Sequence, residues 1–229
     1  MCCDFWKRWQ TSPTDLPVID SPHFQQRWSD YYEAVIDRPP RSTLIQALNS
    51  FATEAPPNLP RNPKYRVGFA VDLGCGNGRD TVELLRRNWR VLAIDGQTEA
   101  INQLRQRQDI NRTYLETRVQ RFESLTLPPS VDLINASFCL PFCPASYFAD
   151  MWEEIVTAIR PGGRFCGQLF GDRDSWAVHP DITHHTLAQV KDFFAPFEIE
   201  LLEEEEHPGK TPLGEERYWH LFHIVARKA

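Results

Sequence analysis

The feature that most constrains this chain is an alternation of short apolar runs with amphipathic segments, which begins near Val67 and continues almost to the end. Apolar runs such as VGFAVDLG (67–74) and VLAID (91–95) are typical of buried parallel strands. The segments between them place leucines and isoleucines three or four residues apart, as in helices that cover a sheet. The alternation therefore predicts an open, mostly parallel sheet with helices on both faces.

The same patterns predict the remaining elements of this half of the chain. We expect strands at 113–119, 131–136, 164–170, 197–202 and 218–225, and helices at 80–88, at 98–108, from Pro144 and at 186–194. Thr186-Leu-Ala-Gln189 is expected to form a capping box at the start of the last of these helices. Arg160-Pro161-Gly162-Gly163 is expected to end the helix before strand five, and the four glutamates at 203–206 to form a solvated turn. Because no helix separates the last two strands, they should form an antiparallel hairpin at one edge.

Residues 1–63 have a different character, because many of the chain's prolines lie there. Proline at this density prevents long regular structure, although apolar stripes predict two helices at 22–37 and 42–51. We therefore expect an N-terminal helical, proline-rich arm or cap at 1–63 and a main domain at 64–229.

Charge and cysteine usage limit the partners and the compartment. The formal net charge is −6 and no cluster of lysine and arginine stands out, which disfavours nucleic acid as a partner. No apolar run approaches the roughly 20 residues of a membrane span, and the N-terminus lacks the apolar core of a signal peptide. The six cysteines show no metal-binding spacing, so we expect reduced thiols in a cytoplasmic protein and no metal site. We expect the protein to be a monomer or a homodimer.

The stretch VDLGCGNGRD (71–80) carries the most chemical information. A strand leads into Gly74, Gly76 and Gly78, which permit positive φ angles and close backbone approach, and a helix follows at once. Such a loop directs backbone N–H groups at a ligand. Asp95 ends the next strand, where a carboxylate is suited to accept hydrogen bonds from a ribose diol.

With these residues the chain resembles the class I S-adenosylmethionine-dependent methyltransferases. The likeness runs from about Val67 to Lys228 and is carried by VDLGCGNGRD (71–80), VLAID (91–95), VDLINASF (131–138) and RPGGRF (160–165). GCGNGR (74–79), TRV (117–119) and VARK (225–228) are most similar to the tellurite-resistance-type small-molecule methyltransferases. The resemblance implies a Rossmann-like doubly wound α/β fold with a seven-stranded sheet in the order 3-2-1-4-5-7-6.

The resemblance also implies a set of cofactor-binding residues for S-adenosyl-L-methionine. The loop would line its methionine and ribose, Asp72 would orient the amine, Asp95 would bind the ribose hydroxyls, and the residues after Asp95 and after strand three would flank the adenine. Residues at the end of strand four would border the methyl-transfer site. Carried over by position, the loop and flanking residues are Gly74, Cys75, Gly76, Asn77, Gly78, Gly96, Gln97, Arg121, Phe122, Asn135, Ala136 and Ser137, with Glu123 as a substitute acid.

The acceptor side is predicted from topology and residue chemistry. Asp172, in the segment that follows strand five, and His220, in the last strand, are the expected catalytic residues; His223, three positions on, should face the opposite side of the sheet. In the arm, Tyr32 is expected to place its ring near the sulfonium and Arg38 to bind the cofactor's carboxylate. The acceptor is a small molecule, with a thiol, chalcogen oxyanion, amine or hydroxyl all left open.

Two alternatives of other classes fit the same loop. A nicotinamide-dependent oxidoreductase would use the same contact between Asp95 and ribose, but Arg79 stands where a dinucleotide fingerprint needs its third glycine. A non-catalytic cofactor-binding protein would keep the fold without turnover.

Overall fold

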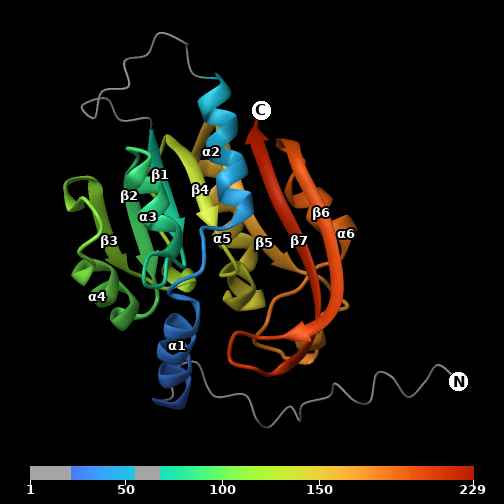
Figure 1. Ribbon diagram of the computed structural model, residues 1–229. Coiled ribbons are helices and arrows are strands. Elements are labelled where there is room, and N and C mark those ends of the chain that lie inside the picture. The colour runs from blue at the N-terminus through green and yellow to red at the C-terminus, as the bar shows by residue number, and fades with distance from the viewer. Residues whose placement is uncertain (1–21, 55–67) are drawn as a thin grey trace, which may run out of the picture.

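A computed structural model of the chain describes residues 22–54 and 68–229. Its core is a seven-stranded sheet in the order β3-β2-β1-β4-β5-β7-β6 (Figure 1). The pairs among β1 to β5 are parallel, whereas β7 runs antiparallel to both β5 and β6. The predicted strand order and C-terminal hairpin are therefore confirmed. The strands are β1 (Phe69–Leu73), β2 (Arg90–Asp95), β3 (Leu115–Val119), β4 (Val131–Ala136), β5 (Ile159–Phe170), β6 (Phe197–Lys210) and β7 (Glu216–Lys228).

Helices cover both faces of this sheet and create two separate cores, because alternate residues of each strand point to opposite faces. On one face α2 (Ser42–Glu54), α3 (Arg79–Arg86) and α4 (Thr98–Gln106) pack against residues such as Ala70 and Leu133. On the other face α5 (Ala145–Ala158) and α6 (Leu187–Phe193) pack against their neighbours in sequence, Val71 and Ile134. Within the described residues, no helix combines the length and apolarity that crossing a bilayer requires.

The N-terminal arm divides into two differently placed helices. Leu44, Ala47 and Leu48 of α2 are buried in the sheet's core, so α2 belongs to the helical layer of the main fold. The other helix, α1 (Pro22–Val35), lies across the end of the sheet at which the parallel strands finish (Figure 1). Both predicted arm helices are confirmed in position, and the first 21 residues of the arm lie outside the described residues.

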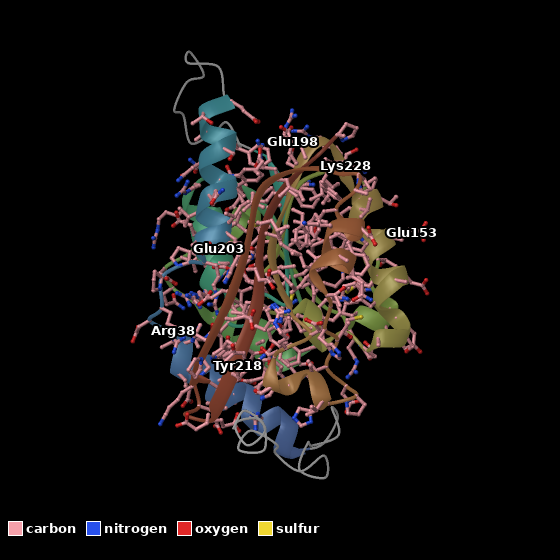
Figure 2. The ribbon with its side chains drawn as sticks, turned by 90° about the vertical axis from the view of Figure 1, so that its right-hand side faces the viewer. Arg38, Glu153, Glu198, Glu203, Tyr218 and Lys228 are labelled. Atoms are coloured by element: carbon pink, nitrogen blue, oxygen red, sulfur yellow. The ribbon has the colours of Figure 1, made fainter. Side chains whose placement is uncertain are left out.

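The C-terminal hairpin is much longer than predicted, and this changes the role of the acidic run. Glu203, Glu204, Glu205 and Glu206 lie inside β6 and pair in register with β7, so the prediction of a solvated turn is wrong. Arg173 and three histidines face these glutamates and stabilise a stretch of strand that repulsion would otherwise disfavour. Figure 2 follows the hairpin from Glu198 past Glu203 to Tyr218, at the same end as Arg38.

The prediction for the helix–strand junction before strand five was also wrong in detail. β5 begins at Ile159, and the Pro161-Gly162-Gly163 segment lies within it as an irregularity between the pairs Val131↔Ile159 and Leu133↔Arg164. Such bulges bend a strand while they keep its pairing on either side. The predicted capping box is confirmed: the Thr186 hydroxyl accepts from the backbone N–H of Gln189, whose side chain accepts from the N–H of Thr186.

Candidate functional site

The loop between β1 and α3 forms the floor of the site. Gly74 and Gly76 have φ angles of 59° and 54°, a left-handed conformation that side chains with a Cβ rarely adopt. An added Cβ at Gly74 would lie 2.2 Å from the Cβ of Cys139, and one at Gly76 would lie 3.0 Å from the ring of Tyr32. Both positions therefore favour glycine, because a side chain would crowd Cys139 or Tyr32 as well as strain the backbone.

Asp95, at the carboxyl end of β2, ties this loop to the neighbouring strand. Its Oδ2 accepts from the backbone N–H of Gly76 and its Oδ1 from that of Gln97, each at 2.8 Å. Burial raises the pKa of the Asp95 carboxyl, and these two donors oppose that shift. Since each carboxylate oxygen accepts through a second lone pair as well, Asp95 keeps the capacity to bind a diol.

Behind the loop, two buried carboxylates share one amide. The Nδ2 of Asn135 donates to Asp72 at 2.8 Å and to Asp80 at 3.1 Å, and the hydroxyl of Thr81 donates to Asp72 at 2.5 Å. Burial, followed by the charge of Asp80, raises the pKa of Asp72 to about 7. The backbone N–H of Arg41 donates to Asp80 at 2.9 Å, which connects the network to the start of α2.

The arm supplies one wall of the site. The Nδ2 of Asn77 donates to the backbone carbonyl of Tyr32 at 3.3 Å, which holds α1 on the glycine loop. Burial raises the pKa of the Tyr32 phenol far above its ordinary range, with the charge of Asp95 as a further cause. At the hairpin end, the side chain of Arg27 in α1 pairs with Glu215 at 2.5 Å. The helix is thus fixed to both sides of the site that it covers.

These walls enclose a cavity of about 830 Å³ at the carboxyl ends of the parallel strands. One end holds the glycine loop, Asp95 and Arg121, and the other end is closed by the β6–β7 hairpin. Odd-numbered residues of the hairpin face the cavity, since its wall includes Glu205, His207, Arg217, Trp219, Leu221 and His223. A cavity of this size suits a nucleoside cofactor together with a small second molecule.

Thirteen of the sixteen predicted cofactor-binding residues line this cavity: Tyr32, Arg38, Asp72, Gly74, Cys75, Gly76, Asn77, Asp95, Gly96, Gln97, Arg121, Phe122 and Ser137. Three others do not line it. Gly78 packs against Leu104 of α4, Asn135 is buried in the carboxylate network, and Ala136 is fully buried in the core. Glu123, the predicted substitute acid, lines the cavity but pairs with Arg121 at 2.6 Å, which lowers the pKa of Glu123.

The two predicted catalytic residues lie outside the cavity wall. His220 is fully buried; its Nδ1 accepts from the backbone N–H of Arg173 at 3.0 Å, and its Nε2 lies 3.0 Å from Glu204. Asp172 lies 3.6 Å from both His220 and Arg173. From Arg217 to His223, the residues of β7 that line the cavity are the odd-numbered ones, so the expectation that His220 and His223 face opposite sides is confirmed, and the residue that reaches the cavity is His223.

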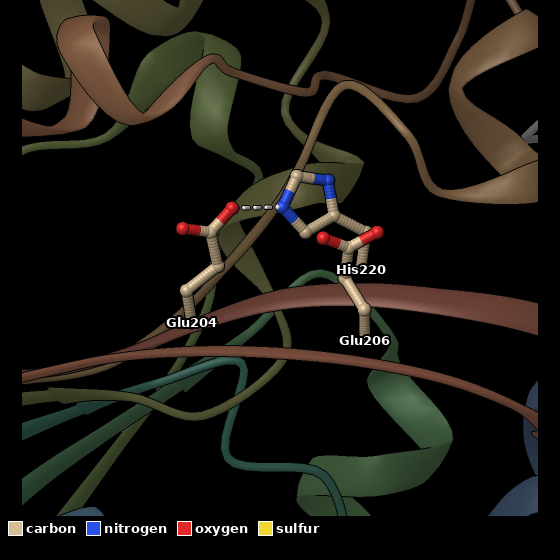
Figure 3. Close-up of side chains that lie close together, drawn as sticks. All are labelled: Glu204, Glu206 and His220. Atoms are coloured by element: carbon tan, nitrogen blue, oxygen red, sulfur yellow. Dashed lines mark hydrogen bonds and ion pairs between the residues drawn. The ribbon is translucent and has the colours of Figure 1, made fainter.

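Glu204, Glu206 and His220 converge closely enough to suggest a metal site (Figure 3). The guanidinium of Arg173 already fills that position, with Nη2 at 2.6 Å from Glu204 and 2.5 Å from Glu206. Hydrogen bonds from His220 and Arg173 lower the pKa of Glu204, and a hydrogen bond from Arg173 lowers the pKa of Glu206. The cluster is therefore a network of ion pairs and hydrogen bonds that joins the β6–β7 hairpin to the segment after β5.

Comparison with known proteins agrees with this geometry. Residues 70–163 match the family model described as a methyltransferase domain, over the strands that form the glycine loop and the Asp95 contact. This match covers less than half of the chain. Curated relatives named trans-aconitate 2-methyltransferase, from Escherichia coli strains, are 27% identical over 135 residues, which is 58% of this chain and 48% of theirs. The chain thus spans about half the length of the curated relatives it matches.

Solved structures of methyltransferases share the fold of this chain. TehB from Haemophilus influenzae has a TM-score of 0.66 at 14% identity and covers 87% of this chain and 67% of its own. A TehB-like methyltransferase from Corynebacterium glutamicum has a TM-score of 0.59 at 15% identity, covering 91% and 100%. Magnesium protoporphyrin IX methyltransferase from Synechocystis with bound S-adenosylmethionine has 0.60 at 13%, covering 92% and 93%.

The residues that line the cavity fit S-adenosylmethionine. The close-packed glycine loop offers backbone groups, Asp95 has spare acceptor capacity for ribose, and Arg38 on the same cavity wall carries the charge that a carboxylate needs. The sequence predictions missed several further wall residues, among them Trp28, Arg41, Phe138, Glu205 and His207. Phe138 could be recognised only from the structure, in which its φ angle is 57°. This conformation is strained for a bulky residue, and such strain is typical of functional sites.

Proposed function

We propose that the protein transfers a methyl group from S-adenosylmethionine to a small-molecule acceptor. The observation that carries this proposal is a single cavity with a cofactor-like end, formed by the glycine loop and Asp95, and a second end walled by aromatic rings and the hairpin. The names of the curated relatives and of the Synechocystis structure, which refer to methylation of small molecules, support it.

In this proposal the chain contributes orientation and exclusion of water. The cofactor, when bound, supplies a methyl group activated by the positive charge of its sulfur. Asp95 would hold the ribose, the loop at Gly74 and Gly76 would hold the methionine part, and Arg38 its carboxylate. Tyr32, buried against the loop, would exclude water from the transfer site. The covering position of α1 provides the enclosure that such a transfer needs.

Calorimetry with S-adenosylhomocysteine tests the cofactor half. The wild-type protein should bind it and should not bind NADH, and Asp95→Asn should weaken binding by about 10- to 100-fold, since hydrogen bonds to a charged group are lost. Asp109→Asn, which changes an exposed carboxylate paired with Arg107, is the matched control and should bind as the wild type does. If the protein bound NADH instead, an oxidoreductase would be favoured. If Asp95→Asn and Asp109→Asn bound S-adenosylhomocysteine with equal affinity, the assignment of Asp95 would be contradicted.

A further inference from the structure

The cavity-facing side of the hairpin holds a carboxylate between two imidazoles. The Oε2 of Glu205 lies 2.6 Å from the Nε2 of His223, and its Oε1 lies 2.9 Å from the Nε2 of His207. Glu205 and His207 come from β6 and His223 from β7, and all three line the cavity. A carboxylate that orients an imidazole in a cavity is the arrangement by which proteins build a proton-accepting group.

The hydrogen bonds assign a proton-accepting atom to this group. The Nε2 of His223 faces the carboxylate, so Nε2 carries the hydrogen, and the Nδ1 of the neutral ring has a free lone pair. The contact of Nδ1 is the Nε2 of Gln168 at 3.5 Å, which is a long distance for a hydrogen bond. Nδ1 of His223 is therefore open to accept a proton, and Glu205 is in place to stabilise the imidazolium that results.

The orientation of Gln168 suits both protonation states of His223. Its Nε2 donates to the hydroxyl of Thr43 at 3.0 Å, whereas its buried Oε1 has no hydrogen-bond partner among the described residues. A half-turn of the amide would present Oε1 to Nδ1–H of a protonated His223, while Thr43, which both donates and accepts, stays bonded.

Aromatic rings form part of the cavity wall near the hairpin. Phe170 is the centre of a group of rings in edge contact, with centroids 6.5 Å from Phe138, 6.3 Å from Phe142 and 6.4 Å from Trp176. The ring of Phe138 in turn lies 6.4 Å from that of His223. All of these residues line the cavity. The ring surfaces that line the cavity favour packing of an aromatic molecule against this wall.

We propose that His223, oriented by Glu205, is the catalytic base and that the acceptor is an aromatic molecule methylated on a phenolic hydroxyl. This inference rests on the proposed function. The phenolic oxygen forms a bond to the methyl carbon, and the electron pair of the broken carbon–sulfur bond stays on sulfur. The phenolic proton goes to Nδ1 of His223, and from there to water after the aryl methyl ether leaves.

Two phenols with different acidity test the base. In p-cresol the hydroxyl keeps its proton at the assay pH, whereas 4-nitrophenol is ionised in mildly alkaline buffer and needs no base. Turnover is followed as S-adenosylhomocysteine formed. His223→Gln should lower kcat/KM for p-cresol by about 10²- to 10⁴-fold but leave that for 4-nitrophenol within about threefold of the wild type. Glu205→Gln should show the same selectivity with a smaller loss, because it removes only the orienting group.

His184→Gln is the matched control, since His184 is exposed, lies outside the cavity wall, and contacts the backbone carbonyl of Ile182. It should leave both rates unchanged. Equal losses on the two phenols in His223→Gln and Glu205→Gln would show a structural role and overturn the base. If the wild-type protein binds S-adenosylhomocysteine but methylates neither phenol, the phenolic acceptor is overturned while the proposed function stands; if it does not bind, the proposed function itself fails.

Discussion

At the scale of single residues, the most unusual feature is the pair of buried acids behind the glycine loop. Asp72 and Asp80 both accept from one Asn135 side chain, in a place where water cannot screen their repulsion. The sequence predicted a role for Asp72 from its position alone. It could not predict the partnership, because that depends on β1, β4 and the start of α3 meeting in space.

The raised pKa of Asp72 predicts how stability varies with pH. An acid whose pKa is raised on folding binds its proton more tightly in the folded state, so its stabilising effect is present at low pH and is lost as pH rises toward about 7. We expect the free energy of unfolding of the wild type to fall between pH 5 and 8 and to fall less in Asp72→Asn. Urea unfolding measures this. Asp109→Asn, a control with an exposed acid, should keep the wild-type slope; a slope unchanged by Asp72→Asn would contradict the assignment.

At the scale of elements, α2 shows how a segment assigned to the arm becomes part of the main fold. Leu44 is fully buried against β5 and β7, strands that follow it by more than a hundred residues. The sequence predicted the helix and its apolar stripe correctly. The surface that the stripe covers was not predictable, since periodicity shows which face is buried and not against what.

Removing one of these side chains should therefore destabilise the whole protein. Leu44→Ala is expected to lower the free energy of unfolding by about 2–5 kcal/mol, through lost burial and the cavity left behind. Thr53→Ala, at an exposed position near the end of the same helix, should change it little. Chemical denaturation of both variants measures the difference, and similar values for the two would mean that α2 is not part of the cooperative core.

Sequence reasoning predicted the elements whose signals lie within a few neighbouring residues. It failed where pairing with a distant strand outweighs the local amino-acid composition. The capping box at Thr186 and the glycine loop were found because their chemistry is local. The acidic run at 203–206 was misassigned because glutamates disfavour strands unless positive partners face them, and those partners lie far away in sequence. Sequence alternation also gives the hairpin two faces and does not say which one meets the cavity, so it could not show that His223 lines the cavity wall and His220 does not.

At the scale of the whole molecule, α1 covers a cavity whose wall combines the glycine loop, the ends of parallel strands and the β6–β7 hairpin. Its residues contact the glycine loop through Asn77 and the hairpin through Glu215, so the cofactor end and the acceptor end share one cover. A ligand that fills the cavity contacts this cover and the loop at once. Binding should therefore stabilise α1 together with both ends of the site.

Hydrogen exchange measures that expectation. S-adenosylhomocysteine should slow amide exchange in residues 28–35 of α1 and in the loop at 74–78, and should leave α6 (Leu187–Phe193) unchanged, because α6 packs on the opposite core. Protection confined to the loop would show that α1 does not respond to the cofactor, and equal protection of α6 would indicate a general rather than a local effect.

The position of β6 at the edge of the sheet affects how molecules of this protein associate with one another. Among the described strands β6 forms one border of the sheet, and its fourteen residues offer a row of backbone groups to any foreign strand. Its four successive glutamates make two such edge strands repel each other. The acidic run that the sequence assigned to a turn therefore also disfavours strand pairing between copies of the molecule. Neutralising these side chains would invite fibrous aggregation well before it unfolded the protein.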